Sequence, residues 1–188
     1  MPRPTKEQID DEILEAAAIL FARHGFKETS VQRIADAVGY SKTGLLHRYP
    51  TKEALQHAVV QRALTSARAI GEEVAGIAPG PARDRAGITR MAELALHWPG
   101  MVALILSGLT TEPGSEIGDA MEEIGQAVFA AFAIDPCGDP RRLVRVTGAL
   151  GALAVAAVAL RDKVPAEALT ELVDVSFDAL GHGRTPTH

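Results

Sequence analysis

The amino-acid sequence predicts an all-α fold, and three observations support this prediction. The chain is 47% hydrophobic but only 4% aromatic, and much of its apolar content is alanine, whereas β-sandwiches are rich in Val, Ile, Thr and aromatic residues. Apolar residues recur at helical spacing in stretches separated by Gly or Pro. No segment alternates apolar and polar residues as a half-buried strand does.

The first helices are marked by their ends. Ile9, Ile13 and Phe21 recur at helical spacing, and Gly25 follows them as the expected C-terminal cap of this helix. Thr29 comes next, with a glutamine three residues later, which is the capping-box pattern of a helix start. We therefore expect a second, short helix that begins at Thr29 and ends at Val38.

Two hydroxyl residues predict the next helices. Ser41 is the expected N-cap of a short helix over residues 42–49, and Thr51 is the expected N-cap of a longer helix that reaches toward residue 75. The Gly/Pro-rich residues 76–81 then break the chain. Beyond this break, apolar stretches predict helices over residues 82–98, 101–109, 116–134, 143–160 and 166–180.

Cysteine use and the first residues favour the cytoplasm. The single cysteine, Cys137, cannot form an internal disulfide, which suits a reducing compartment. The N-terminal residues carry charges where an export signal needs an apolar stretch. Residues 146–160 lack charges, but a spanning helix needs about 20 apolar residues. We interpret this segment as a buried helix and expect no contact with a membrane.

Charge is unevenly distributed along the chain. The formal net charge of −5 argues against non-specific nucleic-acid binding. Residues 1–64, however, contain nine Lys/Arg and eight Asp/Glu, whereas the remainder contains ten and sixteen. The front of the chain is therefore nearly neutral and the back is acidic.

Residues 30–49 predict a helix-turn-helix unit, whose second helix can enter the major groove of DNA. Gly39 supplies the turn residue that tolerates a positive φ. The second helix presents short or polar side chains near its start, namely Lys42, Thr43, Gly44 and His47. Phosphate groups are bound beside helix N-termini, where we expect Thr29 and Ser30 at one helix and Lys52 at another.

The segment ILEAAAILFARHGFKETSVQRIADAVGYSKTGLLHRYPTKEAL resembles the DNA-binding domain of the tetracycline-repressor (TetR) family over about residues 9–60. The resemblance implies an all-helical homodimer that binds palindromic double-stranded DNA and is released by a small effector. It also implies that Thr29, Ser30 and Lys52 contact phosphate, and that the recognition helix faces DNA with Lys42, Thr43, Gly44 and His47. Tyr40 is expected on the DNA side. The family often has a tyrosine at Leu46, so one hydroxyl contact is missing here.

The resemblance predicts two domains: a helix-turn-helix domain over residues 1–50 and a helical effector-binding and dimerisation domain over residues 51–188. We expect a largely apolar effector pocket, lined by Met91, Leu94, His97, Trp98, Met101, Ile105, Met121 and Phe129. The last two helices contain small residues that permit close helix approach. The expected dimer interface consists of Gly148, Gly151, Ala152, Val155, Leu172 and Phe177; burial within one subunit would explain the same small residues.

Two other functions compete with this interpretation. An enzyme is disfavoured because the sequence contains no phosphate-binding glycine loop, no G-x-S-x-G elbow and no H-E-x-x-H pair. We expect no catalytic residues, no metal site and no cofactor. A DNA-binding regulator or architectural protein without an effector, whose body binds a protein partner, stays an alternative. The resemblance favours a repressor, although the sequence does not settle the choice between repressor and activator, and the operator sequence cannot be predicted.

Overall fold

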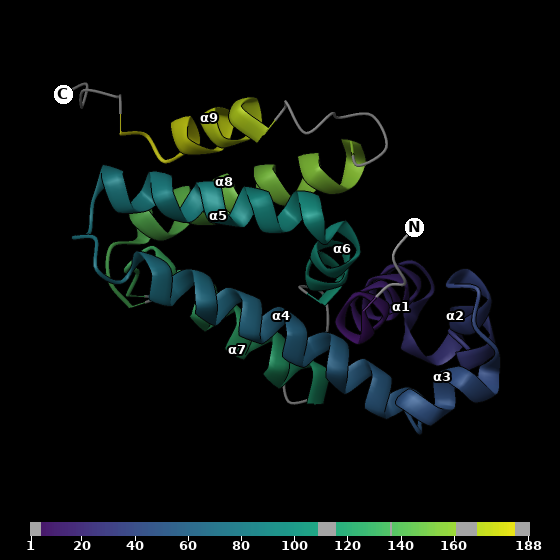
Figure 1. The fold of residues 1–188 in the computed structure, drawn as a ribbon. Coiled ribbons are helices and arrows are strands. Elements are labelled where there is room, and N and C mark those ends of the chain that lie inside the picture. Colours follow the sequence, from purple (N-terminus) through teal and green to yellow (C-terminus); the bar gives the residue numbers. More distant parts are fainter. Residues whose placement is uncertain (1–4, 109–115, 136, 161–168, 183–188) are drawn as a thin grey trace. The chain divides into compact units, whose positions relative to one another are not determined.

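The structure is a computed structural model that describes residues 5–108, 116–135, 137–160 and 169–182. Over these residues the chain forms nine α-helices and no strand, which confirms the predicted all-α fold (Figure 1). The helices are α1 (Lys6–Glu28), α2 (Val31–Ala37), α3 (Lys42–Arg48), α4 (Lys52–Val74), α5 (Pro81–His97), α6 (Pro99–Gly108), α7 (Glu116–Ala131), α8 (Pro140–Leu160) and α9 (Leu169–Ala179).

The helices form two compact units. Unit 1 comprises Met1–Ala63 and Trp98–Met121, and unit 2 comprises Leu64–His97 and Glu122–His188. The chain therefore passes between the units three times, within α4, between α5 and α6, and within α7. The domain boundary predicted near residue 50 falls inside unit 1 and stays a prediction.

Unit 1 is built around an apolar core to which four consecutive helices contribute. The buried side chains of this core come from α1, α2, α3 and α4, and they include Ile13, Phe21, Ile34, Leu45 and Leu55. The helical spacing of apolar residues in the sequence produces this arrangement, because it gives each helix one apolar face. The short helices α2 and α3 are held by this core rather than by their own length.

Helix α6 belongs to unit 1 as well, although α4 and α5 separate it from the N-terminal helices in the sequence. The Glu15 carboxylate of α1 accepts hydrogen bonds from the backbone N–H groups of Gly100 and Met101, in the first turn of α6. A Cβ at Gly100 would overlap the side chain of Ile19. Glycine at this position therefore permits the close approach of α6 to α1.

Unit 2 includes α5, α8 and α9, which pack along one another. Helix α8 buries one face, consisting of Val146, Ala149, Leu153 and Ala157. It is long and apolar enough to cross a membrane by length and composition, but a core helix of a soluble protein passes the same test. The sequence predicted burial of this helix, and the structure shows burial of one face only.

Three helix ends differ from the predictions. Helix α1 does not end at Gly25: this residue forms a kink with φ 77° and ψ 160°, and α1 continues to Glu28. Helix α7 ends at Ala131 rather than at residue 134, because the chain turns at Ala133, which has a φ of +50°. Helix α8 begins at Pro140, where the Asp139 carboxylate accepts a hydrogen bond from the backbone N–H of Arg141 at 2.9 Å. The predicted start of the last helix lies outside the described residues.

Candidate nucleic-acid interface

The turn between α2 and α3 is a Schellman motif, a common glycine-containing end of a helix. The N–H of Tyr40 donates to the carbonyl of Ala35 at 2.9 Å, and the N–H of Gly39 donates to the carbonyl of Asp36 at 3.3 Å. Gly39 has a φ of +71°, which L-residues with a Cβ rarely adopt. The predicted role of this glycine in the turn is confirmed.

Helix α3 begins with the predicted serine cap. The Ser41 hydroxyl accepts a hydrogen bond from the N–H of Gly44 at 3.0 Å. A Cβ at Gly44 would lie 3.1 Å from this hydroxyl, which is a tight contact. Gly44 therefore leaves room for the cap, in addition to the contact with DNA that the sequence predicts for it.

The structure divides the eight predicted DNA-contacting residues by exposure. Four are exposed (Ser30, Lys42, Thr43 and His47), three are half-buried (Tyr40, Gly44 and Lys52), and Thr29 is fully buried. Thr43 and His47 share a face of α3, because they are one helical turn apart. On the opposite side of the same helix, Leu45 is 0% exposed and fixes α3 to the core.

The capping prediction for Thr29 is wrong. The N-cap of α2 is Ser30, whose hydroxyl accepts from the N–H of Arg33 at 3.1 Å. The Thr29 hydroxyl instead donates to the carbonyls of Gly25 at 2.8 Å and Leu20 at 3.1 Å. These are carbonyls of α1 at and before its kink, where the usual helical pairing is interrupted. In this conformation the Thr29 hydroxyl is not available to a phosphate.

Lys52 makes contacts inside unit 1. Its ammonium group donates to the carbonyls of Phe26 at 2.8 Å and Lys27 at 3.2 Å, and it lies 4.3 Å from the centre of the Phe26 ring. Carbonyl groups in the last turn of a helix attract cations. Lys52 therefore ties the start of α4 to the end of α1. The local sequence pattern gave no sign of this role, because the partners are 25 and 26 residues away.

Arg48 and Tyr49 share a partner on α1. The Arg48 guanidinium forms an ion pair with Asp10, and the Tyr49 hydroxyl lies 3.5 Å from the same carboxylate. Burial, and next the negative charge of Asp10, raise the pKa of Tyr49 to about 12. The end of α3 is thus tied to α1. A further basic residue, Arg33 on α2, is exposed, and the sequence pattern did not single it out.

The predicted effector residues are divided between the two units. Trp98, Met101, Ile105 and Met121 belong to unit 1, whereas Met91, Leu94, His97 and Phe129 belong to unit 2. None of these residues lines the polar cavity around Asp84 or the apolar cavity beside Leu172 and Val175. The apolar effector pocket therefore stays a prediction.

The predicted dimer residues lie on α8 and α9, and half of them are exposed in this single chain. Gly148, Ala152 and Val155 are exposed, and Val155 has 57% of its surface accessible. Gly151, Leu172 and Phe177 are half-buried. Exposed Val144 and Val175 extend this apolar surface, so both helices present apolar side chains to solvent.

A short exposed helix, held against a preceding helix by a glycine-containing turn, defines the class of helix-turn-helix proteins. Residues 13–59 match the sequence model of the bacterial regulatory proteins of the tetR family. The DNA-binding part of the chain is thus similar to that of the tetR family, and solved structures of TetR-type regulators share the fold. The resemblance drawn from the sequence is confirmed over this segment, and the proteins that it matches are named regulators.

The relatives in sequence and in structure cover different parts of the chain. The HTH-type transcriptional regulator RutR of Escherichia coli strain K12 is 46% identical over 52 residues, which are 28% of this chain and 24% of RutR. The chain thus matches about a quarter of the length of this curated relative.

Solved structures share the fold over nearly the whole chain. The TetR family transcriptional regulator PfmR from Thermus thermophilus has a TM-score of 0.55 at 20% identity, and the match covers 98% of this chain and 100% of PfmR. A TetR-like transcriptional regulator from Rhodococcus sp. RHA1 has a TM-score of 0.61 at 15% identity, and the match covers 96% and 98% of the two chains.

Proposed function

We propose that this protein is a sequence-specific DNA-binding transcriptional regulator. The observation that carries the proposal is α3 itself: it exposes Lys42 at its first residue and Thr43 and His47 on one face, while Leu45, opposite that face, is buried in the core. Rigid attachment matters because base readout requires side chains held in register with the groove. The match to the tetR family over residues 13–59 includes this helix and supports the proposal.

The proposed contacts are divided by chemistry. Lys42, Thr43 and His47 reach base edges or phosphates from α3, and the missing side chain of Gly44 allows its backbone to approach the DNA. The exposed Ser30 hydroxyl and the half-buried Tyr40 contact phosphate. Thr29 positions Ser30 from the core, and Lys52 holds α4 to α1.

We propose that the protein acts as a homodimer on a palindromic operator. The exposed apolar residues of α8 and α9 support this proposal, since large apolar side chains such as Val155 and Val175 are usually covered when they gather on one surface. A two-fold dimer presents two copies of α3 to two half-sites. Val155→Asp is expected to convert the dimer to a monomer in light scattering, whereas Ala69→Asp, on exposed α4 surface, is expected to leave the mass unchanged.

We further propose a cytoplasmic repressor that a small, largely apolar effector releases from DNA. Such release requires the effector to bind the two conformations of the protein with different affinity. A thermal-shift screen tests the effector class: stabilisation by apolar compounds supports it, and stabilisation by charged, polar ligands alone contradicts it. If no small molecule stabilises the protein, a regulator whose body binds a protein partner becomes the better proposal.

Selection of binding sites from a random DNA pool, followed by salt-titrated affinity measurements, tests DNA recognition. We expect a palindromic consensus bound about a thousandfold or more tightly than random DNA. Lys42→Ala should weaken binding and reduce the salt slope by about 1. Arg68→Gln, which removes one exposed charge of unit 2, is the matched control and should bind normally. Weak binding without a consensus would refute the proposal.

A further inference from the structure

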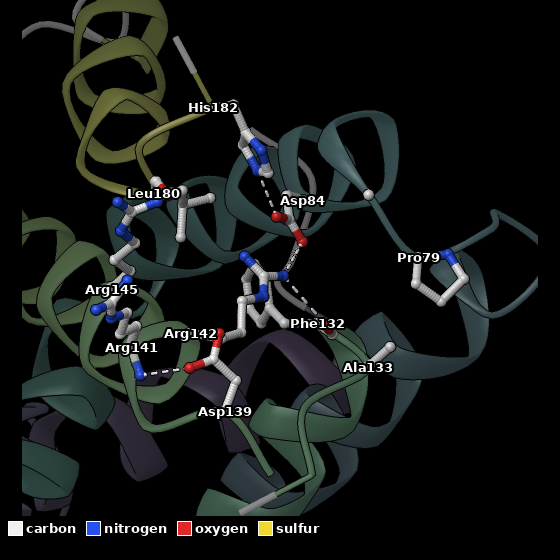
Figure 2. A pocket seen from close by; sticks show the side chains of 11 residues that line it. Pro79, Asp84, Phe132, Ala133, Asp139, Arg141, Arg142, Arg145, Leu180 and His182 are labelled. Atoms are coloured by element: carbon white, nitrogen blue, oxygen red, sulfur yellow. Dashed lines mark hydrogen bonds and ion pairs between the residues drawn. The ribbon is translucent and has the colours of Figure 1, made fainter. Parts of the chain in front are cut away.

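A polar cavity in unit 2 has no role in the proposed function. It has a volume of about 470 Å³, in the range of small-molecule sites. Three arginines and a histidine line it together with two aspartates, so basic residues outnumber acidic ones (Figure 2). The lining residues come from the start of α5, the α7–α8 turn, the start of α8 and the residues after α9.

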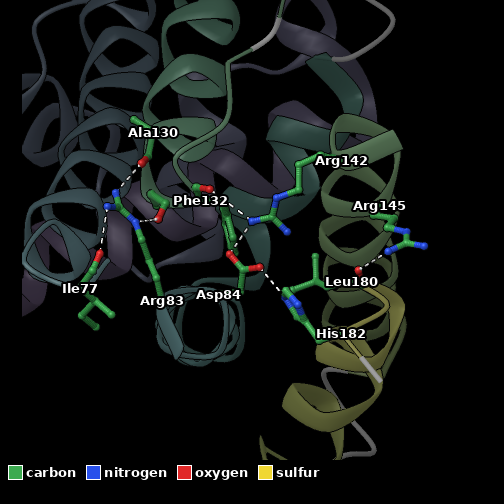
Figure 3. A network of polar contacts seen from close by, with 10 residues as sticks. Ile77, Arg83, Asp84, Ala130, Phe132, Arg142, Arg145, Leu180 and His182 are labelled. Atoms are coloured by element: carbon green, nitrogen blue, oxygen red, sulfur yellow. Dashed lines mark hydrogen bonds and ion pairs between the residues drawn. The ribbon is translucent and has the colours of Figure 1, made fainter. Parts of the chain in front are cut away.

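The frame of this cavity is fixed by a buried carboxylate. Asp84 has a side chain that is 1% exposed, and its two oxygens lie 2.6 Å from a guanidinium nitrogen of Arg142 and 2.6 Å from the Nε2 of His182 (Figure 3). Arg142 also donates to the carbonyl of Phe132 at 3.3 Å. A buried charge without a partner is strongly destabilising, so the contacts of this carboxylate hold its partners in place. They join α5, α8 and the residues that follow α7 and α9 around the cavity.

A neighbouring arginine strengthens the same frame. Arg83 donates to the carbonyls of Ala131 at 2.8 Å, Ala130 at 2.9 Å and Ile77 at 3.3 Å (Figure 3). It thereby satisfies carbonyls at the C-terminal end of α7, which have no partner within that helix. The segment that leads from α7 into the cavity is thus held in place before any ligand binds.

Two cationic side chains of the cavity remain for a ligand. Among the described residues, the Arg141 guanidinium has no hydrogen-bond or ion-pair partner. Arg145 donates one hydrogen bond, at 3.4 Å, to the carbonyl of Leu180. A Cβ at Gly181 would lie 2.7 Å from a guanidinium nitrogen of Arg145, so glycine leaves the space that this side chain occupies. Both arginines lie on the α8 side of the cavity (Figure 2).

The arrangement favours carboxylates over phosphate. Arg141 and Arg145 are four residues apart on one helix, so their Cβ atoms are separated by about 5–6 Å. Each guanidinium can bind one carboxylate through two parallel hydrogen bonds. A guanidinium can also bind phosphate, but the helix start adds little to such a site, because the N–H of Arg141 already donates to Asp139 at 2.9 Å. Two separate guanidiniums are better matched by a ligand that carries two separate carboxylates.

We infer that this cavity binds a small organic dicarboxylate, with one carboxylate on Arg141 and the other on Arg145. This inference goes beyond the proposed function, because the ligand is anionic whereas the proposed effector is apolar. Binding of a dicarboxylate can be measured without DNA, so the inference can be tested even if the protein fails to recognise DNA.

Isothermal titration calorimetry on the full-length protein tests the inference with succinate, glutarate, acetate and inorganic phosphate. We expect succinate or glutarate to bind with a Kd of about 1 mM or below, and acetate, which has one carboxylate, to bind at least about tenfold more weakly. Arg141→Gln should weaken dicarboxylate binding about tenfold or more, because a charge-assisted, two-bond contact with one carboxylate is lost. Since Arg141 is exposed and its guanidinium has no partner among the described residues, this variant is expected to fold normally.

Arg68→Gln is the matched control, because it also removes one positive charge from unit 2 but lies outside the cavity. Equal weakening in both variants would mean non-specific attraction and would overturn the inference. So would the absence of dicarboxylate binding up to about 10 mM. Tighter binding of phosphate than of either dicarboxylate would overturn the ligand class.

Discussion

Replacing Thr29 with valine separates a structural role from a DNA-binding role. Valine has nearly the shape of threonine but no hydroxyl group. The hydroxyl is fully buried and donates to Gly25 at 2.8 Å and to Leu20 at 3.1 Å. Its removal deletes a hydrogen bond and leaves a buried carbonyl without its partner, which costs about 1–3 kcal/mol. For a chain of this length, about 2 kcal/mol lowers the Tm by about 4–8 °C.

The matched substitution is Thr43→Val, the same chemical change at an exposed position of α3. We expect it to change the free energy of unfolding by less than about 0.5 kcal/mol and to weaken binding to the selected DNA. Thr29→Val is expected to do the reverse, with normal DNA affinity at temperatures where it is folded. Urea denaturation followed by fluorescence of Trp98, the single tryptophan, reports unfolding of unit 1, in which this residue is 8% exposed.

The reasoning would be refuted if Thr29→Val kept its stability and lost DNA affinity. That outcome would mean that the hydroxyl leaves its partners on α1 and contacts phosphate in the complex. Loss of affinity in both variants at unchanged stability would lead to the same conclusion.

Three further predictions concern stability. Lys52→Met removes a charged donor 2.8 Å from the Phe26 carbonyl and should lower the free energy of unfolding by about 1–2 kcal/mol in urea; an unchanged midpoint would contradict the proposed tie between α4 and α1. Gly87→Ala places a Cβ 3.1 Å from the buried ring of Phe132. The resulting overpacking costs about 1–3 kcal/mol, which should exceed the gain of about 1 kcal/mol in helix propensity. The Tm of this variant should therefore lie below that of the parent protein. Tyr49 should ionise near pH 12 in a variant that has no other tyrosine, measured by absorbance at alkaline pH. The pKa of Tyr49 in the folded protein lies above its ordinary value of 10.0, so above pH 10 the unfolded chain loses this proton before the folded protein does. The free energy of unfolding should therefore be unaffected below pH 10 and should fall by about 1 kcal/mol, after screening by solvent, as the pH rises toward 12.

Local sequence patterns predicted most of the helices and the turn of the DNA-binding unit. The Ser41 cap and the positive φ of Gly39 depend on residues within a few positions of one another, so the sequence shows their partners directly. The Thr29 prediction failed although the capping-box pattern was present. A neighbouring hydroxyl, Ser30, could fill the same role, and the choice between the two depended on the kink at Gly25.

Contacts over long sequence distances were not predictable. The carboxylate of Asp84 reaches Arg142 and His182 across 58 and 98 residues, and nothing in the local pattern around Asp84 distinguishes it from a solvated acidic residue. The ion pair of Arg48 with Asp10 was not predictable either, since it depends on how α1 and α3 cross. The cavity of unit 2 was missed for this reason: its residues come from four separate segments of the chain.

The position of α6 has a consequence for protein engineering. Because Glu15 accepts hydrogen bonds from the first turn of α6, the unit that contains the DNA-binding helices is not a contiguous module of the sequence. A chimaera that joins residues 1–63 to the body of another regulator would remove both N–H donors from Glu15 and uncover the surface of α1 beside Ile19. Transplanting the operator specificity of this protein therefore requires grafting the exposed face of α3 into the recipient, or moving α6 together with the N-terminal helices.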